Sequence, residues 1–306
     1  KKTEQSALVV GSGPAGLECS MQLARRGYQV ILSETNDFLG GRVQFESSLK
    51  GLSAWARVSD NRVHEILQKA NIDIYKKSTV TQELIDELDI NNIFLATGCH
   101  WRNDGIGRSN RYGITGLSSV NTLTPTDVLN QQDSLGESIV IYDDDQGYLA
   151  GVIADHLSSA GHNITFVTPA SVVSPWTVHT LEQERIQTTL LNQGVNIILN
   201  KTLVHAREGL VDARCVYTQR VSQIPCKTLV LVTERLPETT LYEQLIASTK
   251  SGSLNKHHHI ELIGDALAPG LIVDAIYSGH LAAENFETPE IEIERAMYMR
   301  EMPNLK

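Results

Sequence analysis

The sequence has few cysteines, and those that it has lie far apart. The four are Cys19, Cys99, Cys215 and Cys226, and no two of them have the C-x-x-C spacing. That spacing is typical of thioredoxin-like redox pairs, zinc knuckles and cysteine-ligated iron–sulfur clusters. We therefore expect none of these within the chain, and we interpret the cysteines as reduced thiols.

Long apolar runs and blocks of like charge are also lacking. No run approaches the roughly 20 apolar residues that span a bilayer, and Lys1–Ser6 is too short and polar for a signal peptide. The formal net charge is −10 with the charges scattered, whereas nucleic-acid binders are usually basic. We expect a cytoplasmic protein that binds neither membrane nor nucleic acid. A basic protein partner is compatible with this charge.

One histidine run raises the question of a metal site. Lys256-His257-His258-His259 has no accompanying second group of ligands in the sequence. We interpret it as a polar loop that enters a strand, and we expect no metal site.

The chain begins with a pattern typical of a βαβ unit. The apolar run 7–10 predicts a strand, a helical pattern then extends to Gly27, and 29–33 predicts a second strand. A similar unit starts near residue 138, and a final strand at 260–263 leads into a helix at about 271–286. Residues 102–125 lack periodicity and predict a long loop, whereas 210–220 alternates as an antiparallel strand does.

This order predicts an α/β fold of two Rossmann-like nucleotide-binding domains, the second inserted in the first. We expect a discontinuous FAD- or ADP-binding domain at 1–134 and 234–306. The inserted domain at 135–233 is expected to resemble an NAD(P)-binding domain.

A glycine-rich turn lies between the first strand and the first helix. Its residues Gly11, Ser12, Gly13, Pro14, Ala15 and Gly16 fit G-x-G-x-x-G. In this motif the first glycine permits the tight turn, the second lets a pyrophosphate approach the backbone, and the third allows close helix–strand packing. The helix N-terminus then offers free N–H groups to the phosphates. The turn therefore predicts an adenine dinucleotide site.

Further residues of this site follow other strands. Glu34 ends the second strand, where its carboxylate accepts ribose hydroxyl groups and repels a 2′-phosphate. Gly41 and Arg42 follow, and the Arg42 guanidinium either reaches a phosphate or lies on the surface.

Two strand ends add to the expected site. Thr97-Gly98 and Gly264-Asp265 both come directly after apolar strands. Asp265 is expected to bond the ribityl or sugar hydroxyls of a flavin cofactor, although it is also suited to cap a helix. The helix near Ala275 would face the flavin ring. Trp55 and Val80 complete the expected cofactor-binding residues, and we expect no catalytic residue in the chain.

The second phosphate turn has aspartates in place of glycines. It reads Asp143-Asp144-Asp145-Gln146-Gly147-Tyr148. Like charges about 4 Å apart repel by roughly 4 kcal/mol at an effective dielectric of 20. We therefore do not expect NAD(P) to bind here, unless the aspartates point to solvent.

The whole chain resembles the C-terminal half of the trimethylamine dehydrogenase, histamine dehydrogenase and N-methyl amino-acid demethylase family, of the NADH:flavin oxidoreductase type. The resemblance runs from Val10 to about Glu284, and three further stretches carry it, at 51–55, 96–101 and 174–182. A fourth stretch, Ile263-Gly264-Asp265-Ala266-Leu267-Ala268-Pro269-Gly270, continues to Ala275.

The resemblance implies a glutathione-reductase-like fold that holds FAD, or ADP in its place. It also implies that FMN and a [4Fe–4S] cluster reside on a TIM barrel, and that electrons leave for an electron-transferring flavoprotein. No barrel is visible in this sequence, so we expect it on a missing segment or on a separate subunit of an oligomer. The implied role is the dinucleotide-binding component of an amine dehydrogenase or demethylase. Two alternatives remain open, namely a stand-alone NAD(P)H-dependent FAD oxidoreductase and a structural ADP-binding module. Trp176, in an expected loop, is the best candidate for a docking residue.

Overall fold

The structure, a computed structural model, describes residues 5–88, 90–130, 135–136, 138–251 and 259–288. The chain divides into two compact units. Unit 1 comprises Lys1–Gln44, Ala54–Cys99 and Pro237–Lys306, and unit 2 comprises Phe45–Ser53 and His100–Leu236. The insertion of one α/β unit into another is therefore confirmed.

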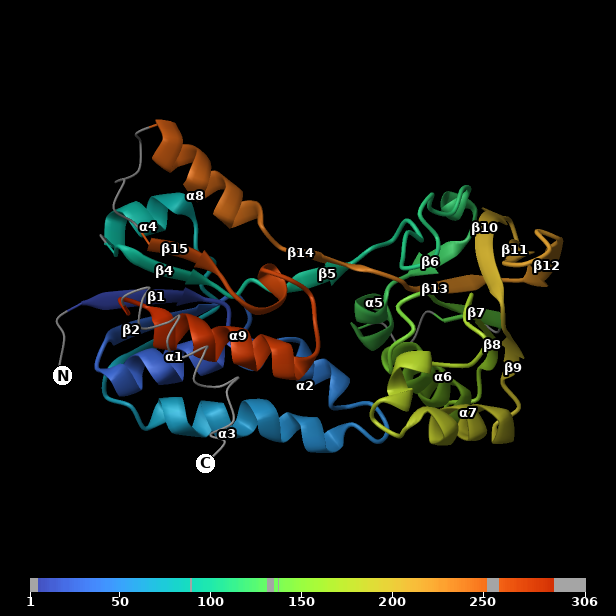
Figure 1. Ribbon diagram of the computed structural model, residues 1–306, viewed down its shortest axis with the longest axis horizontal. Coiled ribbons are helices and arrows are strands. Elements are labelled where there is room, and N and C mark those ends of the chain that lie inside the picture. Colours follow the sequence, from blue (N-terminus) through green and yellow to red (C-terminus); the bar gives the residue numbers. More distant parts are fainter. Residues whose placement is uncertain (1–4, 89, 131–134, 137, 252–258, 289–306) are drawn as a thin grey trace, which may run out of the picture. The chain divides into compact units, whose positions relative to one another are not determined.

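Unit 1 is built on a parallel sheet of five strands in the order β15-β4-β1-β2-β3 (Figure 1). The strands are β1 (Ser6–Val10), β2 (Gln29–Glu34), β3 (Ile72–Lys76), β4 (Asn92–Leu95) and β15 (His259–Leu262). The helices are α1 (Pro14–Arg26), α3 (Ala56–Leu67), α4 (Gln82–Leu88), α8 (Thr240–Ser251) and α9 (Ile272–Asn285). The short helix α2 (Arg42–Glu46) and the turn η1 (Ser53–Trp55) lie where the chain passes between the units.

Helices cover both faces of this sheet, and its central strand β1 is therefore buried on both sides. Ala7 and Val9 of β1 pack in one cluster with residues of α1 and α9, whereas Leu8 and Val10 pack in another with Ile85 of α4. Alternate residues of a strand point to opposite faces. A continuous apolar strand therefore needs a layer of helices on each side.

Unit 2 combines a parallel sheet with an antiparallel one. The parallel sheet has the order β6-β13-β7-β8-β9. Its strands are β6 (Asn121–Leu123), β7 (Ser138–Asp143), β8 (Asn163–Val167), β9 (Asn196–Ile198) and β13 (Thr228–Val232). The antiparallel strands are β10 (Lys201–Arg207), β11 (Leu210–Cys215) and β12 (Val221–Pro225). The helical segments are η2 (Leu117–Ser119), α5 (Pro125–Asn130), α6 (Leu149–Ser159), η4 (Pro175–Val178) and α7 (Gln183–Asn192).

The antiparallel sheet covers one face of the parallel sheet. Leu203, Val211 and Ile224 pack in one cluster with Val140 and Leu231. A separate two-stranded sheet joins β5 (Cys99–Trp101) to β14 (Arg235–Pro237), where the chain passes from one unit to the other and back.

The division between the units differs from the expected boundaries. Residues 100–134 belong to unit 2 rather than to the first domain, because β6 pairs with β13 of the unit 2 sheet. Phe45–Ser53 and 234–236 also belong to unit 2. The prediction of a loop throughout 102–125 was wrong at β6, a three-residue strand too short to show a period. The strand expected at 210–220 ends at Cys215, and a turn leads to β12.

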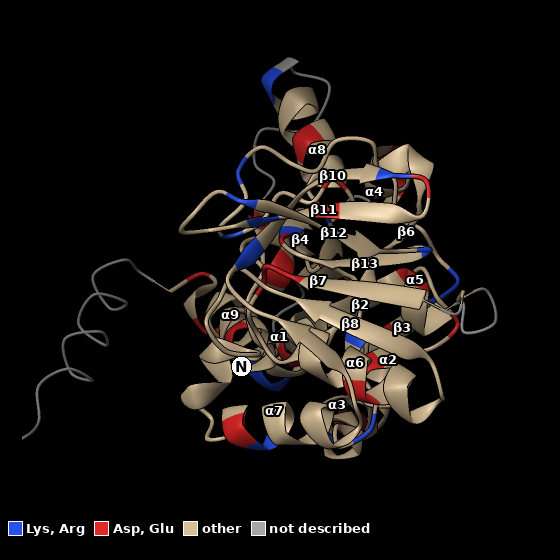
Figure 2. Cartoon of the chain, turned by 90° about the vertical axis from the view of Figure 1, so that its right-hand side faces the viewer, with Lys and Arg blue, Asp and Glu red and all other residues tan. Residues whose placement is uncertain are grey.

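The structure bears on three expectations from the sequence, which concern the scattered charges, the lack of a membrane-spanning segment and the histidine run. Figure 2 shows acidic and basic residues interspersed over the helices and strands, as the scattered charges predict. Within the described residues, no helix has both the length and the apolar character needed to cross a bilayer. Lys256, His257 and His258 lie outside the described residues, and His259 begins β15.

Candidate nucleotide-binding site

The turn between β1 and α1 depends on its glycines for steric reasons. Gly11 has φ +98°, and a Cβ at this position would lie 2.3 Å from the carbonyl oxygen of Ala96. A Cβ on Gly16 would lie 1.9 Å from the carbonyl oxygen of Gly11. At Gly13, the residue before α1, a Cβ would meet nothing within 4 Å. The turn therefore leaves open space at the point where the motif brings a phosphate to the backbone.

A cavity of about 370 Å³ lies at this turn, along the carboxyl edge of the unit 1 sheet. This volume is within the range of small-molecule sites. Twelve residues expected from the sequence line it: Gly11, Ser12, Gly13, Pro14, Ala15, Glu34, Gly41, Arg42, Thr97, Gly98, Asp265 and Ala275. They come from segments that follow four strands of one sheet, so the parallel topology brings them together.

Glu34 is buried and held at one end of the cavity. One carboxylate oxygen, Oε2, accepts the backbone N–H of Ser12 at 2.9 Å and its hydroxyl at 2.5 Å. The other, Oε1, accepts the backbone N–H and the side-chain amide of Asn36, both at 2.8 Å. These donors fix the carboxylate beside the phosphate turn. A carboxylate held in this way suits ribose hydroxyls and disfavours a 2′-phosphate.

Arg42, Cys99 and Asp265 lie together at the other end of the cavity. The Arg42 guanidinium lies 3.3 Å from Asp265 Oδ2, and the Cys99 thiol donates to the same oxygen at 3.1 Å. Asp265 Oδ1 accepts the backbone N–H of Gly270 at 3.0 Å. Asp274 rather than Asp265 accepts the N–H of Leu271 where α9 begins. The cap of α9 therefore does not explain Asp265.

Four expected residues do not line the cavity. Gly16 and Gly264 serve packing instead, because a Cβ on Gly264 would lie 2.5 Å from the methyl group of Ala15. Val80 is buried in the core cluster behind β1 and β4. Trp55 ends the turn η1, before α3.

Several lining residues were missed by the sequence analysis. Asn36 and Glu238 line the cavity, and so does Cys99, whose position in the motif at 96–101 carried no chemical signal of its own. Gly279 of α9 is also significant, because a Cβ there would lie 2.2 Å from the carbonyl oxygen of Ala15. A glycine within a helical pattern indicates such close packing.

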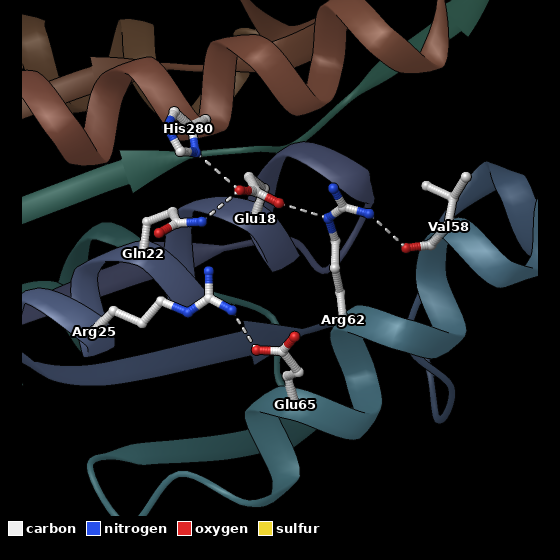
Figure 3. Close-up of polar contacts among 7 residues, drawn as sticks. All are labelled: Glu18, Gln22, Arg25, Val58, Arg62, Glu65 and His280. Atoms are coloured by element: carbon white, nitrogen blue, oxygen red, sulfur yellow. Dashed lines mark hydrogen bonds and ion pairs between the residues drawn. The ribbon is translucent and has the colours of Figure 1, made fainter.

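A buried carboxylate anchors the helix that starts at the phosphate turn (Figure 3). The Glu18 carboxylate on α1 accepts a hydrogen bond from Arg62 Nε of α3 at 2.7 Å. Its other oxygen lies 3.0 Å from His280 Nδ1 of α9. Gln22 donates to it at 2.7 Å. Burial alone would raise the pKa of Glu18, but hydrogen bonds from Gln22, His280 and Arg62 outweigh it, and this pKa lies below its usual value. The charge therefore ties three helices together behind the site.

In unit 2 the corresponding turn is filled by the chain itself. Asp143 and Asp144 are buried rather than directed to solvent. The Asp144 carboxylate accepts the backbone N–H groups of Ser109 and Asn110 at 2.9–3.0 Å. Burial raises the pKa of Asp143 well above its usual value. The Asp144 side chain thus occupies the backbone N–H groups of Ser109 and Asn110 at the turn where a phosphate would approach.

The part of the chain that the structure describes contains no group of three or more His, Cys, Asp or Glu that could hold a metal ion.

The tryptophans differ in exposure. Trp101 is buried, whereas Trp176 of unit 2 is 50% exposed, with the Arg108 guanidinium 5.0 Å from its ring centroid.

The chain matches a protein-family model described as pyridine nucleotide-disulphide oxidoreductase over residues 5–279. The structure is similar to histamine dehydrogenase from Rhizobium sp. 4-9, with 39% identity, a TM-score of 0.90 and coverage of 95% of this chain and 45% of that one. It is also similar to 6-hydroxypseudooxynicotine amine oxidase from Pseudomonas geniculata N1, with 36% identity, a TM-score of 0.88 and coverage of 93% of this chain and 42% of that one. Dimethylamine dehydrogenase from Hyphomicrobium sp. is 28% identical over 98% of this chain and 44% of its own length. The chain thus spans less than half the length of these relatives.

Proposed function

The chain belongs to the pyridine nucleotide-disulphide oxidoreductase family, and on that premise we propose that it is the dinucleotide-binding component of a flavin-dependent amine dehydrogenase or demethylase. In this proposal unit 1 holds FAD, or ADP in its place. The similarity to histamine dehydrogenase and dimethylamine dehydrogenase supports the amine class of substrate. The substrate site itself is proposed to lie outside these residues.

The observation that carries the proposal is the order of groups along the carboxyl edge of the unit 1 sheet. Glu34 ends β2, the glycine turn follows β1, Thr97-Gly98 follows β4, and Asp265 follows β15. Neighbouring strands lie about 4.8 Å apart, so these groups span roughly 14 Å. This succession of a ribose acceptor, a phosphate turn and a second hydroxyl acceptor suits a molecule with a diphosphate at its centre.

Each residue has a specific part in this proposal. Glu34 accepts the ribose hydroxyls, and the N–H groups at the start of α1 bind the diphosphate. Arg42 neutralises a phosphate with its guanidinium, and Asp265 accepts hydroxyls when the cofactor carries a ribityl chain. FAD, when bound, supplies a two-electron carrier, whereas ADP makes the site structural.

We further propose that electrons do not come from NADH through unit 2. Asp144 is already bonded to the backbone N–H groups of Ser109 and Asn110, so a pyrophosphate would have to displace a buried carboxylate. Electrons would then arrive from an FMN and [4Fe–4S] barrel and leave for an electron-transferring flavoprotein, as the family resemblance implies. The whole assembly is proposed to be cytoplasmic and oligomeric.

The alternative is a stand-alone NAD(P)H-dependent FAD oxidoreductase, which the family description favours because it names a pyridine nucleotide. The two functions differ in one anaerobic experiment. NADH or NADPH is added to the purified chain carrying FAD, and the flavin absorption band is followed, with dithionite as the positive control. We expect dithionite to bleach the band and the pyridine nucleotides to leave it unchanged. Rapid bleaching by NADH or NADPH would establish the alternative.

The third possibility, a structural ADP module, is recognised by colour. A colourless chain that releases ADP on denaturation would place all redox chemistry on the barrel or on a partner subunit. For such a chain, the pyridine nucleotide experiment becomes a binding measurement by NADH fluorescence. We expect no binding to unit 2.

A further inference from the structure

The cluster of Arg42, Cys99 and Asp265 includes a thiol to which no role has been assigned. Cys99 Sγ contacts both other groups, 3.1 Å from Asp265 Oδ2 and 3.5 Å from Arg42 Nη1, and these two groups also contact each other at 3.3 Å. The thiol is partly buried and lines the cavity. It therefore contacts both charged groups at the Asp265 end of the proposed nucleotide site.

The backbone fixes the place of this thiol. Gly98, with φ +80°, turns the chain just before Cys99. Its carbonyl oxygen accepts the N–H of Glu238 at 2.9 Å, and the Thr97 hydroxyl donates to the Glu238 carbonyl at 2.6 Å. Cys99 is therefore a fixed point, whereas the Arg42 side chain has several rotatable bonds whose ordering costs entropy.

Strand spacing indicates which part of a nucleotide this cluster meets. A ribose held by Glu34 at β2 places the first phosphate at the turn after β1. The next group then extends toward β4, the strand that Cys99 follows, at roughly 10 Å from β2. In ADP or FAD that next group is the second phosphate, and AMP lacks it.

We propose that Cys99 is a positioning residue for the second phosphate of the bound nucleotide. The thiol orients the Asp265 carboxylate, and together they hold the Arg42 guanidinium in the place where it meets that phosphate. The proposal rests on the proposed function of unit 1, because it requires a nucleotide at this cavity.

The first test compares ADP with AMP by isothermal titration of nucleotide-free chain. In Cys99→Ala we expect ADP affinity to fall about tenfold, because a hydrogen bond to a charged group is lost. AMP affinity should remain within a factor of two or so of wild type, since AMP does not reach the cluster. Cys99→Ser, which keeps an O–H donor, should retain most of the ADP affinity.

The outcomes separate the role of Cys99 from the function of the site. Equal losses for ADP and AMP, or no loss for either, would overturn the positioning role and leave the nucleotide site intact. A wild-type chain that binds neither ADP nor FAD would overturn both the positioning role and the proposed function.

A second test uses the wild-type chain and needs no folded variant. Iodoacetamide forms an S–C bond with a thiol and releases iodide, and mass spectrometry locates the label. Saturating ADP should slow the labelling of Cys99 several-fold without changing that of Cys215, an internal control in unit 2. Hydrogen bonds from Thr218 lower the pKa of Cys215 to about 7, so this thiol reacts readily. Labelling of Cys99 at the same rate with and without ADP would contradict the proposal.

Discussion

At the scale of single residues, the glycines of the first turn have different roles. Gly11 and Gly16 are required by the fold itself, because a Cβ on either would collide with backbone atoms. Gly13 has open space around the position of a Cβ, and its φ of −64° suits any residue. The fold therefore does not require a glycine at 13, and the proposed nucleotide does.

Replacement of these glycines should separate folding from binding. Gly13→Ala is expected to change the free energy of unfolding by less than about 0.5 kcal/mol, while the bound nucleotide is lost or strongly reduced. Gly16→Ala is expected to destabilise the nucleotide-free chain by about 1–3 kcal/mol through overpacking. Thermal unfolding and nucleotide extraction measure the two effects. Full nucleotide retention in Gly13→Ala would argue against a phosphate at this turn.

Glu34 offers a second test at the same scale. In Glu34→Gln the amide presents a donor toward the N–H groups of Ser12 or Asn36, and the acceptor charge is lost. We expect ADP affinity to fall at least tenfold, as for a lost charged hydrogen bond. Discrimination against 2′-phosphorylated ADP should also weaken. Glu87→Gln on α4, an exposed position in the same unit, is the matched control.

At the scale of elements, Glu18 connects α1 to α3 and α9, as Figure 3 shows. Its side chain is buried, with 5% exposed. The neighbouring pair Arg25–Glu65 joins the same helices α1 and α3, but both side chains are over 40% exposed. Ion pairs at the surface contribute little, whereas removing one partner of a buried pair is costly.

The buried pair Glu18–Arg62 gives a prediction, and the exposed pair Arg25–Glu65 gives its control. Glu18→Gln should lower the free energy of unfolding by about 3 kcal/mol, because Arg62 loses its buried partner. Glu65→Gln should lower it by less than about 1 kcal/mol. Equal effects in denaturant unfolding would contradict the structural role of Glu18.

The pH dependence of Glu18 follows from its lowered pKa. Because the folded state holds this pKa below the usual value of 4.5, the carboxylate stabilises the fold above that pH. The stabilisation is lost as pH falls through the folded-state pKa. The stability difference between wild type and Glu18→Gln should therefore shrink on acidification below pH 4.5. A difference that stays constant would show that the charge has no part in it.

Asp143, the last residue of β7 in unit 2, has a pKa shifted in the opposite direction from that of Glu18. Its Oδ2 has no hydrogen-bond partner, and burial raises its pKa well above the usual value of 3.8. Such a group contributes stability below pH 3.8, and this contribution is lost as pH rises toward the folded-state pKa. Asp143→Asn should gain on wild type by about 1–3 kcal/mol as pH rises above 3.8, because the amide cannot ionise in its buried position. Denaturant midpoints that change in parallel for both proteins would contradict this.

At the scale of the whole molecule, the two α/β units differ at corresponding turns. Unit 1 keeps the glycine turn with a cavity in front of it, and unit 2 fills its turn with Asp144. Ligands that bind only the folded state stabilise it according to their concentration and affinity. The two turns therefore predict different responses to different nucleotides.

Thermal unfolding measures this difference. ADP at one hundred times its Kd should stabilise the nucleotide-free chain by about 2.7 kcal/mol. NADH at the same concentration should leave the unfolding of unit 2 unchanged, since the turn between β7 and α6 is closed. Comparable stabilisation of unit 2 by NADH would show that a phosphate displaces the Asp144 side chain.

The parts that could be predicted from the sequence are those with local patterns. The glycine turn and Glu34 have fixed spacing within one βαβ unit, so their proximity follows from the motif. The place of Cys99 beside Arg42 and Asp265 depends on contacts between distant segments, and no local pattern marks it. The bonds from Ser109 and Asn110 to Asp144 depend on a loop whose path has no periodicity. The expected boundary at residue 134 failed for the same reason, because β6 is recognisable only by its pairing with β13.

The most direct test of the central claim is the identity of the nucleotide that the purified chain carries. The chain is denatured, and the released small molecules are identified by chromatography and mass spectrometry. We predict FAD or ADP in a one-to-one ratio with the chain, and a yellow protein if it is FAD. A chain that releases no adenine nucleotide, and takes up neither FAD nor ADP when they are added, would contradict the account.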